Sequence, residues 1–210
     1  MRKMFHVVLL FLSFCVMSCS STKNSDSVYD KVMEKQYKDK QKELNKDGWK
    51  VATTTFTLDA ALMRYYRALN ESENNKPIVA SVEMCKSMNV CKSSALNNAI
   101  IEYAQGASSH VRGRITSDMF NNASAPSPEE FDKFYAAYER LVSAEIKGEL
   151  EFMLDLQKEN GSGKSYQAWY IVNEEKAGKA RIRAMQRAFE ETKIAQEYAN
   201  QVANFVREGF

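Results

Sequence analysis

Two cysteines, Cys85 and Cys91, remain as a pair in the middle of the chain, after the N-terminal segment. An even pair so close in sequence predicts a disulfide in an oxidising compartment. In the chain-entropy model, a loop this short stabilises a fold by about 2 kcal/mol. Two alternatives stay open. The thiols can remain free, or they can join Met84 and Met88 in a soft-metal site, because thiolate and thioether ligands suit monovalent copper.

The other two cysteines, Cys15 and Cys19, lie in an N-terminal segment that has the parts of a secretory signal. Arg2 and Lys3 precede an apolar run at residues 5–17. This run is shorter than the about 20 residues that a membrane-spanning helix needs. The sequence therefore predicts a signal peptide over residues 1–18.

The last four residues of this segment, Val16-Met17-Ser18-Cys19, resemble the bacterial lipobox. This resemblance implies that Cys19 is diacylated and becomes the first residue of the mature chain. Cys15 fits less well, because the bulky Phe14 precedes it where a small residue is needed. Ser20 after the cysteine implies sorting to the outer membrane of a diderm bacterium. The alternative is an ordinary cleaved signal followed by an unmodified cysteine.

The charge of the mature chain is balanced. The full sequence has 29 basic and 27 acidic residues, and loss of the signal peptide removes Arg2 and Lys3 but no acid, which leaves 27 of each. A neutral chain predicts neither a nucleic-acid-binding face nor a polybasic patch for anionic lipid.

Other motifs that could support catalysis or ligand binding have simpler interpretations. The run at residues 161–165, GSGKS, resembles the end of a phosphate-binding loop, but Lys158 stands where that loop needs a glycine. We interpret it as a hairpin turn and expect no nucleotide. His110 is the only histidine of the mature chain, and Trp49 and Trp169 would be the first residues to inspect with it around a pocket.

Charged side chains are expected to be solvated or to pair on one helix. Alternation along residues 150–156 places Glu149, Glu151 and Asp155 on the polar face of a strand, so we do not interpret them as a glycosidase pair. Three arginines, at 181, 183 and 187, are expected to pair with Glu190 and Glu191 one turn later.

Hydrophobic periodicity divides the chain into helices and strands. A polar tether is expected over residues 19–27, and the predicted break near residues 121–128 precedes a helix capped by Ser127. Predicted helices cover residues 28–46, 58–69, 93–107, 128–147 and 174–207, and predicted strands cover 50–57, 78–84, 111–118, 150–156 and 165–172, the last two forming a hairpin.

The pattern predicts an α+β fold: a mostly antiparallel sheet with helices packed on one side and a long C-terminal helix. Residues 28–210 are expected to form one domain, which could be subdivided near residues 121–128. Asp47-Gly48-Trp49, a strand, an Ala-rich helix and the run at residues 111–117 resemble small bacterial envelope lipoproteins. Those lipoproteins share a domain with the N-terminal part of the flagellar assembly protein FlgT. The resemblance implies a fold and an address, and no catalytic residues.

These observations predict an envelope protein anchored by lipid on Cys19, on the periplasmic face of the outer membrane, with a binding or structural role. Its expected partners are the membrane and other envelope proteins, with no cofactor, metal or nucleic acid. The alternative is a periplasmic small-ligand carrier or an enzyme with an unrecognised pocket.

Overall fold

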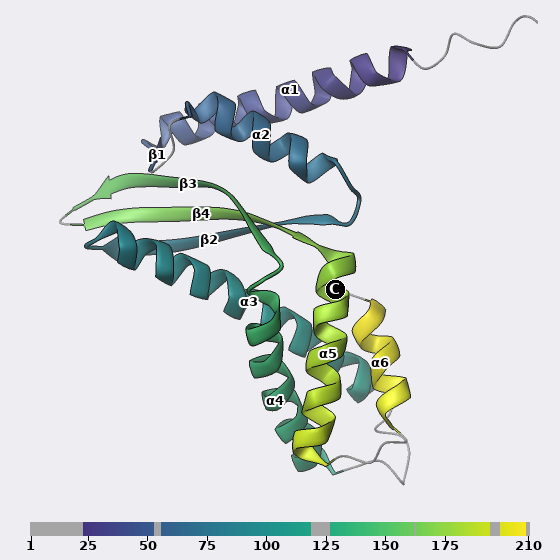
Figure 1. Ribbon diagram of the computed structural model, residues 1–210. Helices are drawn as coiled ribbons and strands as arrows, with labels where there is room; N and C mark the ends of the chain where they lie inside the picture. Colours follow the sequence, from purple (N-terminus) through teal and green to yellow (C-terminus); the bar gives the residue numbers. More distant parts are fainter. Residues whose placement is uncertain (1–22, 53–55, 119–126, 162, 194–197, 209–210) are drawn as a thin grey trace, which may run out of the picture.

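The computed structural model describes residues 23–52, 56–118, 127–161, 163–193 and 198–208 (Figure 1). Within these ranges the chain has the predicted α+β composition, with helices around an antiparallel sheet. In chain order the elements are α1 Lys23–Lys46, β1 Lys50–Val51, α2 Leu58–Asn70, β2 Asn75–Cys85, α3 Met88–Asp118, α4 Pro128–Ile146, β3 Leu150–Asn160, β4 Gly163–Asn173, α5 Glu174–Thr192 and α6 Ala199–Glu208.

The sheet has the strand order β1-β3-β4-β2, and every pairing is antiparallel. Its centre is the predicted β3–β4 hairpin, which closes with Asn160 opposite Gly163. Gly161 lies in this turn with a φ of 59°, a left-handed conformation that glycine adopts without strain. The hairpin interpretation of the GSGKS run is therefore confirmed.

Helices cover both faces of the sheet, not one face as the sequence analysis expects. The central strand β4 is buried along most of its length because its alternate residues meet different helices. Trp169 and Ile171 pack in the cluster under α1 and α2, whereas Ala168 and Tyr170 pack in the cluster that includes α3. A nearly continuous apolar run of this kind is typical of a strand that is buried on both sides.

The long helix α3 replaces a predicted strand. The run Val111–Asp118 alternates apolar and polar residues, which predicts a strand, yet it forms the C-terminal part of α3. Ala104, Ala107, Val111 and Ile115 are all buried, and their spacing of three or four residues is the period of a helix. The apparent alternation covers only part of this longer helical stripe.

Below the sheet, the second half of α3 packs with α4, α5 and α6 in a helical bundle (Figure 1). The predicted start of α4 is confirmed: Ser127 Oγ accepts a hydrogen bond from the backbone N–H of Glu130, whose carboxylate accepts one from the Ser127 N–H. The predicted apolar stripe of α4 is buried in the bundle, at Phe131, Phe134, Tyr135, Tyr138, Leu141 and Val142.

The predicted long C-terminal helix is wrong, because the described chain has two shorter helices there. α5 ends at Thr192 with Lys193 in the left-handed region, and α6 then lies along α5. The Arg181 Nε donates to the Val206 carbonyl oxygen at 3.3 Å, which joins the first half of α5 to the last turns of α6. This reversal buries Val202, Phe205 and Val206, which a continuous helix would carry past the end of the bundle.

The N-terminal elements also differ from the expected boundaries. α1 begins at Lys23, so residues 23–27 are helical where a tether is expected, and residues 19–22 lie outside the described residues. Of the strand predicted over residues 50–57, the structure shows Lys50–Val51. Thr57 serves instead as the N-cap of α2, and residues 53–55 lie outside the described residues. No helix within the described ranges is both long enough and apolar enough to cross a membrane.

Candidate functional site

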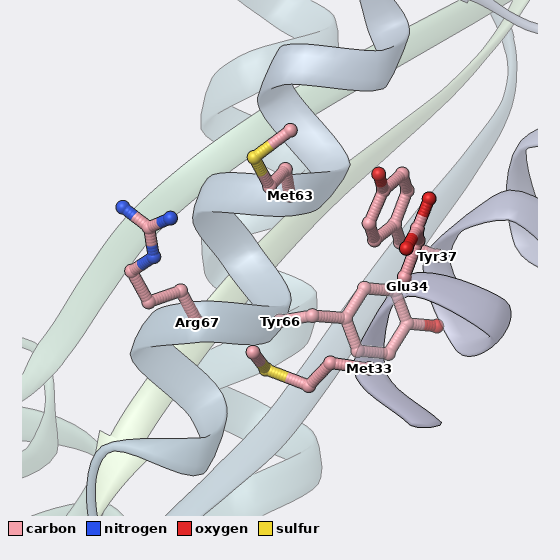
Figure 2. A pocket seen from close by; sticks show the side chains of 6 residues that line it. All are labelled: Met33, Glu34, Tyr37, Met63, Tyr66 and Arg67. Carbon is pink, nitrogen blue, oxygen red and sulfur yellow. The ribbon is translucent and has the colours of Figure 1, made fainter. Parts of the chain in front are cut away.

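A groove on the described surface lies between α1 and α2. Both helices are amphipathic, and Leu44 of α1 joins Leu62 and Tyr65 of α2 in a core above the sheet. Tyr66 points into the space between the helices at the edge of this core. Figure 2 shows its ring extending from α2 toward Met33 and Tyr37 of α1.

On one side of Tyr66 the groove forms a cavity of about 170 Å³. Aromatic and thioether side chains make most of its wall, and a glutamate and an arginine lie at its rim (Figure 2). Methionine adapts its shape to irregular partners, so this lining suits contact with an apolar side chain. The cavity is lined by Met33, Glu34, Tyr37, Met63, Tyr66 and Arg67.

A second depression, of about 610 Å³, also uses Tyr66 and is wide open to solvent. Burial raises the pKa of Tyr66, and the nearby Glu43 carboxylate raises it further, so its hydroxyl stays protonated and able to donate at neutral pH. Polar and charged residues make most of this depression, which is lined by Gln36, Asp39, Lys40, Glu43, Tyr66, Leu69 and Asn70.

The two tryptophans singled out from the sequence both lie in the core below this groove. Trp49 is 7% exposed and Trp169 is 4% exposed, and both belong to the cluster between α1, α2 and the sheet. The Tyr65 ring packs edge-on against Trp169 with 5.0 Å between centroids. Lys158 Nζ lies 4.7 Å from the Trp49 ring centroid. Both tryptophans therefore support the helices and do not line either cavity.

His110 is not brought to these tryptophans. It lies in α3 beside Ala107 and Val111, which pack in the helical bundle and not in the cluster above the sheet. The three residues named for inspection around one pocket are thus divided between two cores.

A buried carboxylate that the sequence analysis expects to be solvated lies on the α3 face of the sheet. Asp155 is 0% exposed, and the Tyr166 hydroxyl donates to its Oδ2 at 2.9 Å. Lys92 Nζ lies 3.9 Å from the same oxygen. Burial, together with the hydrogen bond to Asp155, raises the pKa of Tyr166, so the tyrosine remains a donor to the carboxylate.

A β-bulge places Asp155 on the other face of the sheet from Glu151. The register of β3 against β4 shifts between Phe152 and Leu154, so the alternation of side chains is not continuous along the strand. Glu151 lies opposite Ile171 on the α1–α2 face, whereas Asp155 lies opposite Ala168 on the α3 face. The expected common face of these carboxylates is therefore wrong.

A second buried polar cluster joins α3 to α5. Arg181 is 2% exposed, and its Nη1 donates to Glu174 Oε2 at 2.8 Å and also to the Tyr103 hydroxyl. The Tyr103 hydroxyl donates in turn to Glu174 Oε1 at 3.2 Å. Each group is used in a contact between helices, which gives the cluster a structural role.

Arg183 and Arg187 of α5 pair with a residue of α4 and not with Glu190 or Glu191 one turn along their own helix. Arg183 Nε lies 2.8 Å from Glu145 of α4, and Arg187 Nη1 lies 3.3 Å from the same carboxylate. Glu191, expected to receive one of them, pairs with Arg140 of α4. These pairs connect α4 to α5 across their exposed edge.

The structure contains a disulfide between Cys85 and Cys91, with their Cα atoms 5.5 Å apart. It joins the end of β2 to the first turn of α3, which confirms the predicted pairing over free thiols and a metal site. The lipid-attachment candidate, Cys19, lies outside the described residues. Among the described residues, no group of three or more His, Cys, Asp and Glu side chains is arranged to hold a metal ion.

Comparison with known proteins finds no match: no family model matches the chain, and no curated protein matches its sequence significantly.

Proposed function

We propose that this protein is anchored by lipid to the bacterial cell envelope and has a binding or structural role there. The observation that carries the proposal is Cys19, which follows a charged start, a short apolar run and a small residue. Each buried acyl methylene contributes about 0.8 kcal/mol, and stable anchoring needs at least two chains, which lipobox processing supplies.

The disulfide between Cys85 and Cys91 supports this address independently of the N-terminus. Disulfides persist in the periplasm and other oxidising compartments and are rare in the cytosol. The outer membrane and its periplasmic face remain the proposed location, on the basis of Ser20 after the cysteine.

The α1–α2 groove supports a binding role. Its cavity of about 170 Å³ is smaller than the roughly 300–1,000 Å³ of most small-molecule sites, but it fits one apolar side chain of a partner protein. The groove also belongs to the elements nearest the proposed anchor, because α1 begins four residues after Cys19. We therefore propose other envelope proteins as partners.

The wider depression on the other side of Tyr66 favours a second candidate, a small-ligand carrier. Its volume of about 610 Å³ lies within the range of ligand sites. Native mass spectrometry of protein purified from the envelope would distinguish the two candidates, because a carrier is expected to retain a small molecule of defined mass.

The anchor is tested by expressing the full chain in a diderm bacterium. Mass spectrometry is expected to find the mature N-terminus at Cys19 with acyl chains attached, and the protein should enter the detergent phase on phase separation. Cys19→Ala should abolish acylation and detergent partitioning, while the control Cys15→Ala should leave both unchanged. A mature N-terminus elsewhere, or a Cys19 without acyl mass, would contradict the proposal.

A further inference from the structure

One face of α1 carries a row of lysines along the side that α2 does not cover. The residues on the covered side, such as Tyr37 and Leu44, are half-buried or buried. The lysines follow one another at intervals of three or four residues, which keeps them on a single face of a helix. This lysine face consists of Lys31, Lys35, Lys38, Lys42 and Lys46, all of them exposed.

The lysine face points away from the rest of the protein. At 100° per residue its centre is roughly opposite the side of α1 that carries Tyr37 and Leu44. Figure 1 shows α1 as the outermost element on this side of the sheet, above α2. Between its first and last lysine the face is about 22 Å long, at 1.5 Å per residue.

Nearby acids neutralise this face only in part. Lys38 pairs with Glu34, and Lys42 Nζ lies 4.0 Å from Asp39. No ion pair with another described residue is formed by Lys31, Lys35 or Lys46. The segment Lys31–Lys46 contains six lysines and three acidic residues, and Asp30 and Asp47 flank it, so six lysines stand against five acids in a chain whose mature form is neutral.

We propose that the lysine face of α1 lies on a bilayer of anionic phospholipid. Charge complementarity favours this partner, because lysines held near an anionic membrane each add to the attraction and their effects accumulate along a helix. Position favours it too, although this argument rests on the proposed acylation: α1 begins four residues after Cys19. This proposal departs from the expectation that the chain has no basic patch for anionic lipid.

The consequence is a fixed orientation. With the lysine face on the bilayer, α2 and the sheet lie on the far side of α1, and the α1–α2 groove opens sideways above the membrane surface. The lipid on Cys19 would then hold the protein in place while α1 determines which side faces the membrane.

Vesicle binding of the unacylated chain tests the lysine face independently of the anchor. Residues 19–210 with Cys19→Ser contain every described element. They should co-sediment with vesicles of phosphatidylethanolamine that contain about 30% phosphatidylglycerol, because phosphatidylglycerol gives the vesicle surface a negative charge. Binding should be at least about tenfold weaker to phosphatidylcholine vesicles, and also in 0.5 M salt, where charges are screened within about 4 Å.

A charge-matched pair of variants locates the effect. The triple change Lys31→Gln, Lys35→Gln and Lys46→Gln should weaken binding by about tenfold or more, since these three lysines have no described ion pair. The control changes Lys76, Lys133 and Lys176 to Gln, which removes three exposed charges from other elements and should change binding less than twofold. Circular dichroism checks that both variants remain folded.

Three outcomes would overturn the proposal. The parent chain could fail to bind anionic vesicles, it could bind phosphatidylcholine equally well, or both triple variants could lose the same affinity. Binding to purified lipopolysaccharide or to an envelope protein, without binding to phosphatidylglycerol vesicles, would assign the lysine face to that other partner. None of these results bears on acylation, which the mass of the mature N-terminus reports separately.

Discussion

The ion pair between Arg181 and Glu174 is the charged contact with the least access to water in the described structure, with 3% and 18% of the two side chains exposed. Removing one member of a buried pair leaves the other charge without compensation, which costs far more than loss of an exposed pair. The neighbouring Glu175 pairs with Lys179 in solvent, with about two thirds of each side chain exposed. Adjacent glutamates in the first turn of α5 thus provide a matched comparison.

We expect Glu174→Gln to lower the free energy of unfolding by about 2–3 kcal/mol, because Arg181 then remains buried without its counter-charge. Glu175→Gln should cost less than about 1 kcal/mol, since exposed pairs contribute little. Urea denaturation followed by circular dichroism measures both. Similar losses of unfolding free energy in the two variants would show that the buried pair contributes no more to stability than the exposed pair.

The same residues show where reasoning from sequence fails at the residue scale. Arg181 lies in line with the buried Ala177 and Ala184 of α5, so helical spacing places it on the inward face, but an arginine is expected at the surface from its residue type. Asp155 likewise follows an alternation that predicts exposure, but the bulge near Met153 places it on the face that α3 covers, and the opposite face is covered by α1 and α2. Such burial depends on partners distant in sequence, including Tyr103 for Arg181.

At the scale of single elements, the connection between β2 and α3 depends on the disulfide. β2 is an edge strand of the sheet, and α3 starts within three residues of its end. The disulfide restricts the unfolded chain over this junction and also holds Cys91 against the apolar contacts of the α3 face.

Replacing both cysteines by serine should therefore destabilise the protein by about 2 kcal/mol, which corresponds to a loss of roughly 4–8 °C in Tm for a domain of this size. Differential scanning calorimetry of the oxidised parent and the Cys85→Ser, Cys91→Ser variant measures the difference. Thiol titration of the unreduced parent provides the check on the bond itself. Two reactive thiols would contradict the disulfide.

Elements with strong local signals were predictable from sequence. Ser127, Pro128 and Glu130 form a complete helix start within four residues, and the β3–β4 hairpin has a glycine turn between two apolar runs. Failures occurred where tertiary packing decides the outcome. The stretch Val111–Asp118 continues a helix because its apolar side chains pack in the helical bundle. The chain reverses after Thr192 because Val202 and Val206 are buried against neighbouring helices.

The candidate site residues were likewise predictable where the signal is local in sequence, and not where tertiary packing decides. The pairing of Cys85 with Cys91 was predictable because the two cysteines are close in sequence. The groove around Tyr66 was not, because its walls come from two helices that only the tertiary structure brings together. The lysine face of α1 was visible in the spacing of its residues but hidden by the neutral charge of the whole chain.

At the scale of the whole molecule, the ionisation of buried tyrosines makes the stability of the fold depend on pH. Burial raises the pKa of Tyr65 and of Tyr135 to about 12, and it also raises the pKa of Tyr103, Tyr138 and Tyr166. In the unfolded chain these groups ionise near pH 10. A raised pKa in the folded state contributes stability below pH 10 that is lost as the pH rises toward the folded value, because the unfolded chain then releases protons first.

We therefore expect the Tm to be steady with respect to tyrosine ionisation up to about pH 9 and to fall steeply between about pH 10 and 12. Thermal denaturation by circular dichroism across this range tests the expectation, with tyrosinate absorbance as a second measurement. Absorbance should rise together with unfolding and not before it. Full tyrosinate formation in the native protein would contradict the burial of these side chains.

α3 runs from beneath the sheet into the helical bundle and contributes side chains to both cores. Because this single helix of 31 residues belongs to both halves, we expect that neither half folds as an isolated domain. A cut within α3 would leave two fragments, each with an unfilled interior, and we would expect them to regain their shape only by re-associating.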